Sequence, residues 1–171
     1  YFDPHSTDID TEFWCSGMTE EVITALDKLG LFDVKSRSDV IRFKDKEKNT
    51  EEIKKLLNVD AYLEGSLQRS KDKVRITAQL IDANSGFHLW SETYDRPIDD
   101  ILEVQDEISQ KIAITLGLKL ADVQHDILEV KSTESVEAFD KASQGLYYFD
   151  RNMYDESLVS FNEAILIDPS Y

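Results

Sequence analysis

The stretch Arg75–Arg96, RITAQLIDANSGFHLWSETYDR, decides the fold class of this chain. Apolar residues occupy every second position from Val74 to Leu80, and polar residues occupy the positions between them. That period of two is typical of an antiparallel strand with one buried face. Asn84-Ser85-Gly86 then favours a turn, and β character resumes at Phe87. We therefore predict two strands and their connection here, rather than the wall of a reactive pocket.

A third run of β character, AYLEGSLQR (residues 61–69), comes before this stretch and is separated from it by SKDK. Gly65 lies inside that run, where a glycine marks a bulge or a close approach of another group. In the last run, Trp90 and Tyr94 share a face with His88 and Glu92. We expect the two aromatic residues to form a cross-strand cluster in the core. Together the three runs predict a meander.

Helical patterns lie on both sides of the meander. Residues 18–30 predict a helix with Thr19 as its N-cap and Gly30 as its stop. Asn49 and Glu52 form a capping-box-like pair before a second helix. The segment LFDVKSR, residues 31–37, lies between these two helices and reads as a short strand. A last helix is predicted by a stripe of apolar residues at helical spacing: Ile101, Val104, Ile108, Ile112 and Leu116.

The predicted fold is therefore α/β, with helices packed on a mixed sheet in the order β-α-β-α-β-β-β-α. Residues 138–171 then change character. In a 34-residue frame that starts at Ala138, small, aromatic and proline residues fall at positions 8, 11, 24, 27 and 32: Gly145, Tyr148, Phe161, Ala164 and Pro169. This spacing resembles one tetratricopeptide repeat, an all-α helix–turn–helix unit. One such repeat cannot bury its own apolar face, so we expect more repeats in the native protein.

Composition excludes several classes of function. The 171 residues carry 35 acids and 19 bases, a formal net charge of −16, which would repel a phosphate backbone. No apolar run is long enough to cross a bilayer, so we expect no membrane insertion by this segment. Cys15 is the single cysteine and cannot form a disulfide within the chain. The start at Tyr1 suggests a piece of a longer protein, whose location in the cell the sequence leaves open.

No pattern of residues indicates catalysis. His5, His88 and His125 are scattered and lack the spacing of a metal site. The chain contains no nucleophile elbow, no glycine-rich phosphate loop and no HExxH motif. Cys15 has no basic neighbour in sequence that would make it a reactive thiolate. We expect no catalytic residue, no cofactor and no metal.

Four motifs in order resemble the TolB amino-terminal-domain-like module of bacterial signalling proteins: GMTEEVITAL, NVDAYLEGSLQR, RITAQLIDANSGFHLWSETYDR and DDILEVQDEISQKI. The resemblance covers about residues 1–120, and it implies a mixed sheet with helices on a face and no catalytic residues. The family pattern begins with an apolar strand, of which only Tyr1-Phe2 remains here, so the first strand is expected to be truncated. In the family, this module often precedes tetratricopeptide repeats and is joined to a cyclase, a winged-helix domain or a kinase.

The resemblance divides the chain into the module (1–120), a connector (121–134) and the repeat (135–171). It implies a non-catalytic sensory or protein-interaction segment of a larger bacterial signalling protein. Two alternatives stay open: a ligand-binding regulatory domain of an adenylate or guanylate cyclase, and, more weakly, an envelope scaffold related to TolB. A closed apolar pocket with a few polar groups would favour the ligand-binding domain.

The expected partner is a protein or a peptide. In such repeats the first helix lines the concave face, which assigns five residues to partner contacts: Phe139, Ala142, Leu146, Phe149 and Asp150. The helix pair also carries more apolar surface than two helices hide between themselves. Docking on the α/β module or self-association would bury it, and we favour self-association.

We predict that the purified chain turns over neither ATP nor GTP, because it lacks a phosphate loop, metal-ligand spacing and a nucleophile–base pair. Product formation would be measured with Mg²⁺ or Mn²⁺ present. Metal-dependent turnover that one substitution within residues 1–171 abolishes would contradict the prediction.

Overall fold

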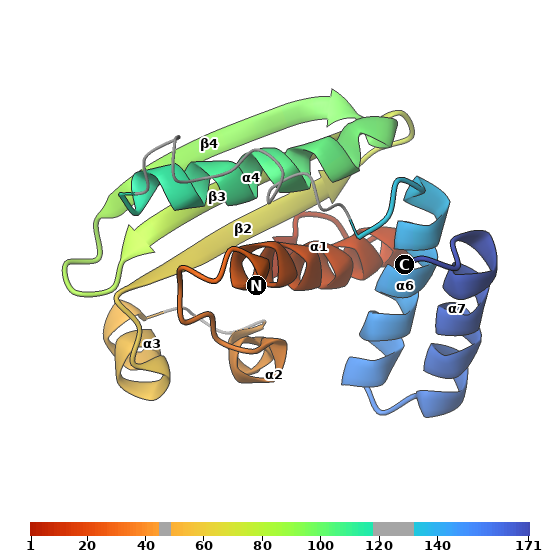
Figure 1. The fold of residues 1–171 in the computed structure, drawn as a ribbon, viewed down its shortest axis with the longest axis horizontal. Helices are drawn as coiled ribbons and strands as arrows, with labels where there is room; N and C mark the ends of the chain where they lie inside the picture. Colours follow the sequence, from red (N-terminus) through yellow and green to blue (C-terminus); the bar gives the residue numbers. More distant parts are fainter. Residues whose placement is uncertain (45–48, 118–131) are drawn as a thin grey trace.

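The computed structural model describes residues 1–44, 49–117 and 132–171. Figure 1 shows a β-sheet with helices packed along it and a helical hairpin at one end. The elements in chain order are β1 (Phe2–Pro4), α1 (Ile9–Lys28), α2 (Arg37–Val40), the 3₁₀ turn η1 (Ile41–Phe43), α3 (Thr50–Leu57), β2 (Ala61–Arg69), β3 (Lys73–Asp82), β4 (His88–Pro97), the 3₁₀ turn η2 (Ile98–Asp100), α4 (Ile101–Thr115), α6 (Val136–Asp150) and α7 (Tyr154–Ile167).

The sheet contains four strands in the order β1-β2-β3-β4. β1 runs parallel to β2, whereas β2, β3 and β4 form an antiparallel meander. The predicted α/β fold with a mixed sheet is therefore confirmed. The alternation in β3 is confirmed as well, because Val74, Ile76, Ala78 and Leu80 are all buried.

Helices cover one face of this sheet. The buried residues of β3 belong to one core cluster with apolar residues of α1 and α4, and Ile101, Val104, Ile108 and Ile112 supply the α4 part. The other face carries polar pairs between β3 and β4. Arg75 lies 2.8 Å from Asp95, and the hydroxyls of Thr77 and Thr93 are 3.1 Å apart. The sheet is thus buried on one side and polar on the other, as its alternation requires.

Gly65 marks a close approach, as the sequence predicted. β1 pairs with β2 so that Phe2 lies opposite Gly65, and a Cβ on Gly65 would overlap with the Phe2 ring. Phe2 is itself fully buried in the core. The missing side chain therefore makes room for the ring that joins β1 to the sheet.

Two local predictions are wrong. Residues 31–37 form no strand, because β1 occupies the position beside β2 and Leu31 stays exposed; Arg37 instead begins α2. The first helix begins at Ile9 rather than after Thr19. Thr19 lies inside α1, where its hydroxyl donates a hydrogen bond to the Cys15 carbonyl.

The predicted face of β4 needs a correction at His88. A register shift next to Leu80 pairs Trp90 with Leu80 but His88 with Ile81, so the alternation breaks between the two β4 residues. His88 is exposed, Trp90 is partly buried against the core, and Tyr94 is fully buried. Of the two aromatic residues expected in the core, Tyr94 is therefore a core residue, and Trp90 packs at the edge of the core.

The helical hairpin α6–α7 docks on the module through α6, which lies against α1 (Figure 1). Trp14 of α1 packs edge-on against Phe139 of α6, and the two rings are 5.5 Å apart. The Trp14 indole N–H also donates a 2.6 Å hydrogen bond to Asp140. The Phe13 ring meets the Tyr147 ring at 4.8 Å. This is the intramolecular outcome of the two considered from sequence, and self-association stays a prediction.

The docking makes one core out of parts that the sequence divided. Phe139 and Tyr147 belong to the same buried cluster as the residues of the sheet and α4. Of the predicted connector, 121–134, only residues 132–134 are described. His125 also lies outside the described residues.

Gly17 offers a test of this docking, because a Cβ there would overlap with Ser143 Oγ and lie 2.8 Å from the Phe139 ring. Alanine normally stabilises a helix interior relative to glycine by about 1 kcal/mol. We predict that Gly17→Ala instead lowers the free energy of unfolding by about 1–3 kcal/mol, through overpacking. Urea titration would measure it, with the exposed Asp27→Ala of the same helix as control. A stabilised Gly17→Ala variant would contradict the docked arrangement.

Candidate functional site

The hairpin is held together by small residues at its centre. A Cβ on Gly145 would lie 2.6 Å from the Phe161 ring, so the glycine lets α7 approach α6 closely. Ser157 donates a 2.9 Å hydrogen bond to the Gly145 carbonyl, and Ala164 of α7 is buried. Two positions of the repeat frame, 8 and 24, therefore lie in the contact between the helices.

The five predicted partner-binding residues divide into two groups. Phe139 is fully buried against Trp14, and Asp150 forms an ion pair with Arg37 of α2. Ala142, Leu146 and Phe149 are partly or largely exposed. Their spacing of four and then three residues places them on one face of α6. Of the five predicted contact residues, these three are therefore the accessible apolar ones.

A stripe on α7 extends this face. Tyr154, Leu158, Phe161 and Ile165 follow each other at spacings of four, three and four, and three of them are exposed. The Phe149 and Tyr154 rings, 5.8 Å apart, join the two helices. We call the combined surface the hairpin face; it consists of Ala142, Leu146, Phe149, Tyr154, Leu158, Phe161 and Ile165. The α7 residues were not among the five predicted partner-binding residues, although Phe161 and Ile165 belong to the apolar surface that the sequence predicts to need covering.

Charged groups hold the far end of α6 against α1 and α2. The Arg37 side chain is 11% exposed and the Asp150 side chain 14%, and Glu20 of α1 lies 3.8 Å from the Arg37 Nε. Arg151 binds Glu12 of α1 at 2.9 Å. Its guanidinium also lies 3.5 Å from the centre of the Tyr147 ring. Desolvated ion pairs of this kind fix one orientation of the hairpin more than they stabilise it.

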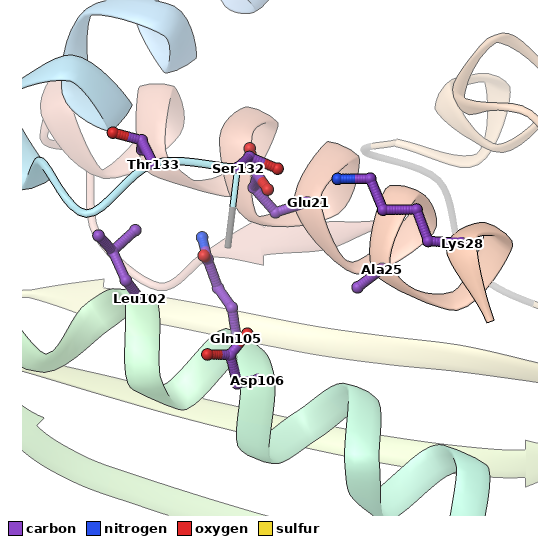
Figure 2. A pocket seen from close by; sticks show the side chains of 8 residues that line it. All are labelled: Glu21, Ala25, Lys28, Leu102, Gln105, Asp106, Ser132 and Thr133. Atoms are coloured by element: carbon purple, nitrogen blue, oxygen red, sulfur yellow. The ribbon is translucent and has the colours of Figure 1, made fainter. Parts of the chain in front are cut away.

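A small cavity lies between α1, α4 and the start of the hairpin (Figure 2). Its volume is about 20 Å³, which is room for about one water molecule. The Gln105 side chain lines it, and its amide nitrogen is buried with no hydrogen-bond partner among the described residues. Glu21 and Thr133 line the opposite side. The cavity is too small for a regulatory metabolite.

A larger hollow of about 660 Å³ lies at the surface between α3 and the turn that joins β3 to β4. Its lining is polar, with Lys54, Lys55, Asn58 and Asn84 among the contributors. Lys54 bonds Asn84 across it. It lacks the mostly apolar walls of a typical small-molecule site.

Cys15, the single cysteine of the chain, is buried in the core. Burial raises the pKa of the Cys15 thiol, and the nearby Asp3 carboxylate raises it further, so Cys15 stays protonated. In residues 1–44, 49–117 and 132–171, no three His, Cys, Asp or Glu side chains form a group that could hold a metal ion. No helix in those same ranges has the length and apolar character needed to cross a membrane.

No model of a known protein family matches the chain. The chain is 33% identical over 171 residues to "Putative adenylate cyclase 3" of Rhizobium meliloti (strain 1021). The alignment covers 98% of this chain but 29% of that relative. The chain thus spans less than a third of that relative's length, and the similarity is consistent with a segment of a signalling protein.

The ion pair between Arg37 and Asp150 predicts a strong coupling. Removing one partner of a buried pair costs about 3–5 kcal/mol, whereas replacing both by apolar residues costs much less. Arg37→Met should be the more harmful single change, because it leaves both Asp150 and Glu20 without their cation. The double variant Arg37→Met/Asp150→Leu should be more stable than Arg37→Met alone.

Urea unfolding of the unsubstituted chain, the two single variants Arg37→Met and Asp150→Leu, and the double variant measures this coupling. Arg42→Met is the control, because Arg42 and its partner Asp39 are about half exposed and such pairs contribute little. Strictly additive losses in the double variant would show that the two side chains do not interact.

Proposed function

We propose that this chain is a non-catalytic interaction segment of a larger bacterial signalling protein, with the hairpin as its partner-binding element. One observation carries the proposal: α6 uses one side to dock on the module, while a continuous apolar surface on α6 and α7 stays open. Leu158 is 62% exposed and Ile165 is 51% exposed on that surface.

The exposed hairpin face has a physical consequence. Covering apolar surface contributes about 25 cal/mol per Å², and a contiguous apolar surface of this kind is typical of an interaction site. Its apolar residues, some on each helix, offer a surface against which a further helix could pack. In a repeat protein, that helix would come from the next repeat.

The module contributes position rather than chemistry. Because α6 packs on α1 and α1 packs on the sheet, a partner on the hairpin is held at a fixed place relative to the sheet. We propose that this module is of the TolB amino-terminal-domain-like class, as its four motifs indicate, and that the hairpin is a tetratricopeptide repeat. The contact between Gly145 and Phe161 supports the second assignment.

The alternative is a ligand-binding regulatory domain of an adenylate or guanylate cyclase. The description of the similar protein as an adenylate cyclase favours a connection with such an enzyme. The cavities favour it less, since the enclosed one has room for a water molecule and the larger one is polar and at the surface. A ligand that binds the native state would raise the melting temperature of the chain.

Site-specific photo-crosslinking tests the proposed function. A benzophenone amino acid at Leu158, introduced into the full-length native protein in bacteria, should form a defined crosslink on illumination. Ile165→Gln in the same protein should lower the crosslink yield severalfold, because it removes apolar contact from the face without disturbing the core.

The control position is Lys111, which is exposed on α4 away from the hairpin. Equal yields at Lys111 and Leu158 would contradict the proposal. A crosslink between two copies of the protein would identify self-association as the use of the face.

A further inference from the structure

The helix α7 exposes further apolar residues that do not belong to the hairpin face. Val159 is 57% exposed and Leu166 is 82% exposed. They are seven residues apart, which places them on one side of the helix, two turns from each other. We call this pair the outer ridge.

A helix that packs on the hairpin face cannot cover the outer ridge as well. Val159 and Leu166 each follow a hairpin-face residue, Leu158 and Ile165, by one position. Successive residues are rotated by about 100° around a helix axis, so the ridge points well away from the groove between α6 and α7. The inner side of α7 is occupied too, since Ser157, Ser160 and Ala164 are buried. The outer ridge is therefore a separate surface.

The charges around the ridge select its partner. Helix α7 contains three acids and no base. Glu163 is neutralised by Lys141 at 2.7 Å, but Asp155 and Glu156 have no ion pair among the described residues. A second copy would bring the same uncompensated acids against each other, in a chain of net charge −16. A partner with basic flanks gains attraction instead.

We propose that the outer ridge binds an amphipathic helix of another protein, with an apolar stripe that meets Val159 and Leu166 and with Lys or Arg beside that stripe. The two ridge residues are seven apart, which matches apolar residues repeated every three or four positions on the bound helix. The basic side chains then face Asp155 and Glu156. This contact goes beyond the proposed function, because it uses a different side of α7.

The probe is a labelled synthetic helical peptide of about 20 residues, with a leucine stripe and lysine flanks, long enough to form a helix. A matched peptide carries the same stripe with glutamate flanks. Fluorescence anisotropy with the 171-residue chain should show binding of the lysine peptide, weakened by salt. The glutamate peptide should bind at least about tenfold more weakly.

The decisive variant is Val159→Gln/Leu166→Gln, which keeps the net charge and favours a helix. It should weaken the binding of the lysine peptide by about tenfold, because the loss of central apolar contacts removes most of the affinity. Leu31→Gln/Leu56→Gln is the matched control, because these two leucines are also exposed but lie outside the hairpin, and it should change the affinity less than about twofold. Melting temperatures would show that both variants fold.

Unchanged binding in Val159→Gln/Leu166→Gln, or equal affinity for the two peptides, would overturn the proposal. So would a dimer in sedimentation that the same substitutions dissociate, since the occupant would then be a second copy. If Leu158 formed no specific crosslink, the proposed function would fail, but the peptide-binding results would be unaffected. The two proposals can therefore fail independently.

Discussion

The structure depends on one helix, α1, that is buried on two sides. The sheet takes one side, and α6 takes the other through Phe13, Trp14 and Gly17. Consequently, nearly every residue from Thr11 to Thr19 is buried. A helix in this position cannot be amphipathic, because it has no side left for solvent. The same constraint requires a glycine where α6 comes closest.

This constraint explains where prediction from sequence succeeded and where it failed. β3 and α4 each have one buried side, so their periods of two and 3.6 residues were visible in the sequence. Their predicted core residues are buried except Leu116, which follows the end of α4 and is exposed. The first half of α1 has no such period, so the predicted start after Thr19 is eleven residues later than the observed start at Ile9. The edge beside β2 is occupied by β1 and not by residues 31–37, because Phe2 packs against Gly65, a residue distant from it in sequence. No local signal shows that competition.

The candidate site shows the same division between local and long-range information. The repeat frame put Ala142, Leu146 and Phe149 at helical spacing, which is a local property, and the structure leaves all three partly or largely exposed. It could not show that Phe139 and Asp150 are occupied by Trp14 and Arg37, which lie more than a hundred positions earlier in the chain. Whether a side chain on the predicted contact face is exposed or buried depends on such contacts between residues distant in sequence. The docked α6 could be inferred from sequence only as one of two outcomes.

Docking also changes what the hairpin can do for a larger protein. A hairpin on a free tether would bind a partner without affecting the sheet, since no packed contact would connect them. Here the partly buried pair of Arg37 and Asp150 and the bond from Trp14 to Asp140 fix α6 on α1. A partner that shifts or orders the hairpin must then either move α1 and the sheet with it or break these desolvated contacts, which costs free energy. Packed helices of this kind are elements through which binding at one site changes another, provided they have a second arrangement. The low exposure of Arg37 and Asp150 makes the loss of either side chain costly, because the remaining charge would be left uncompensated at this junction.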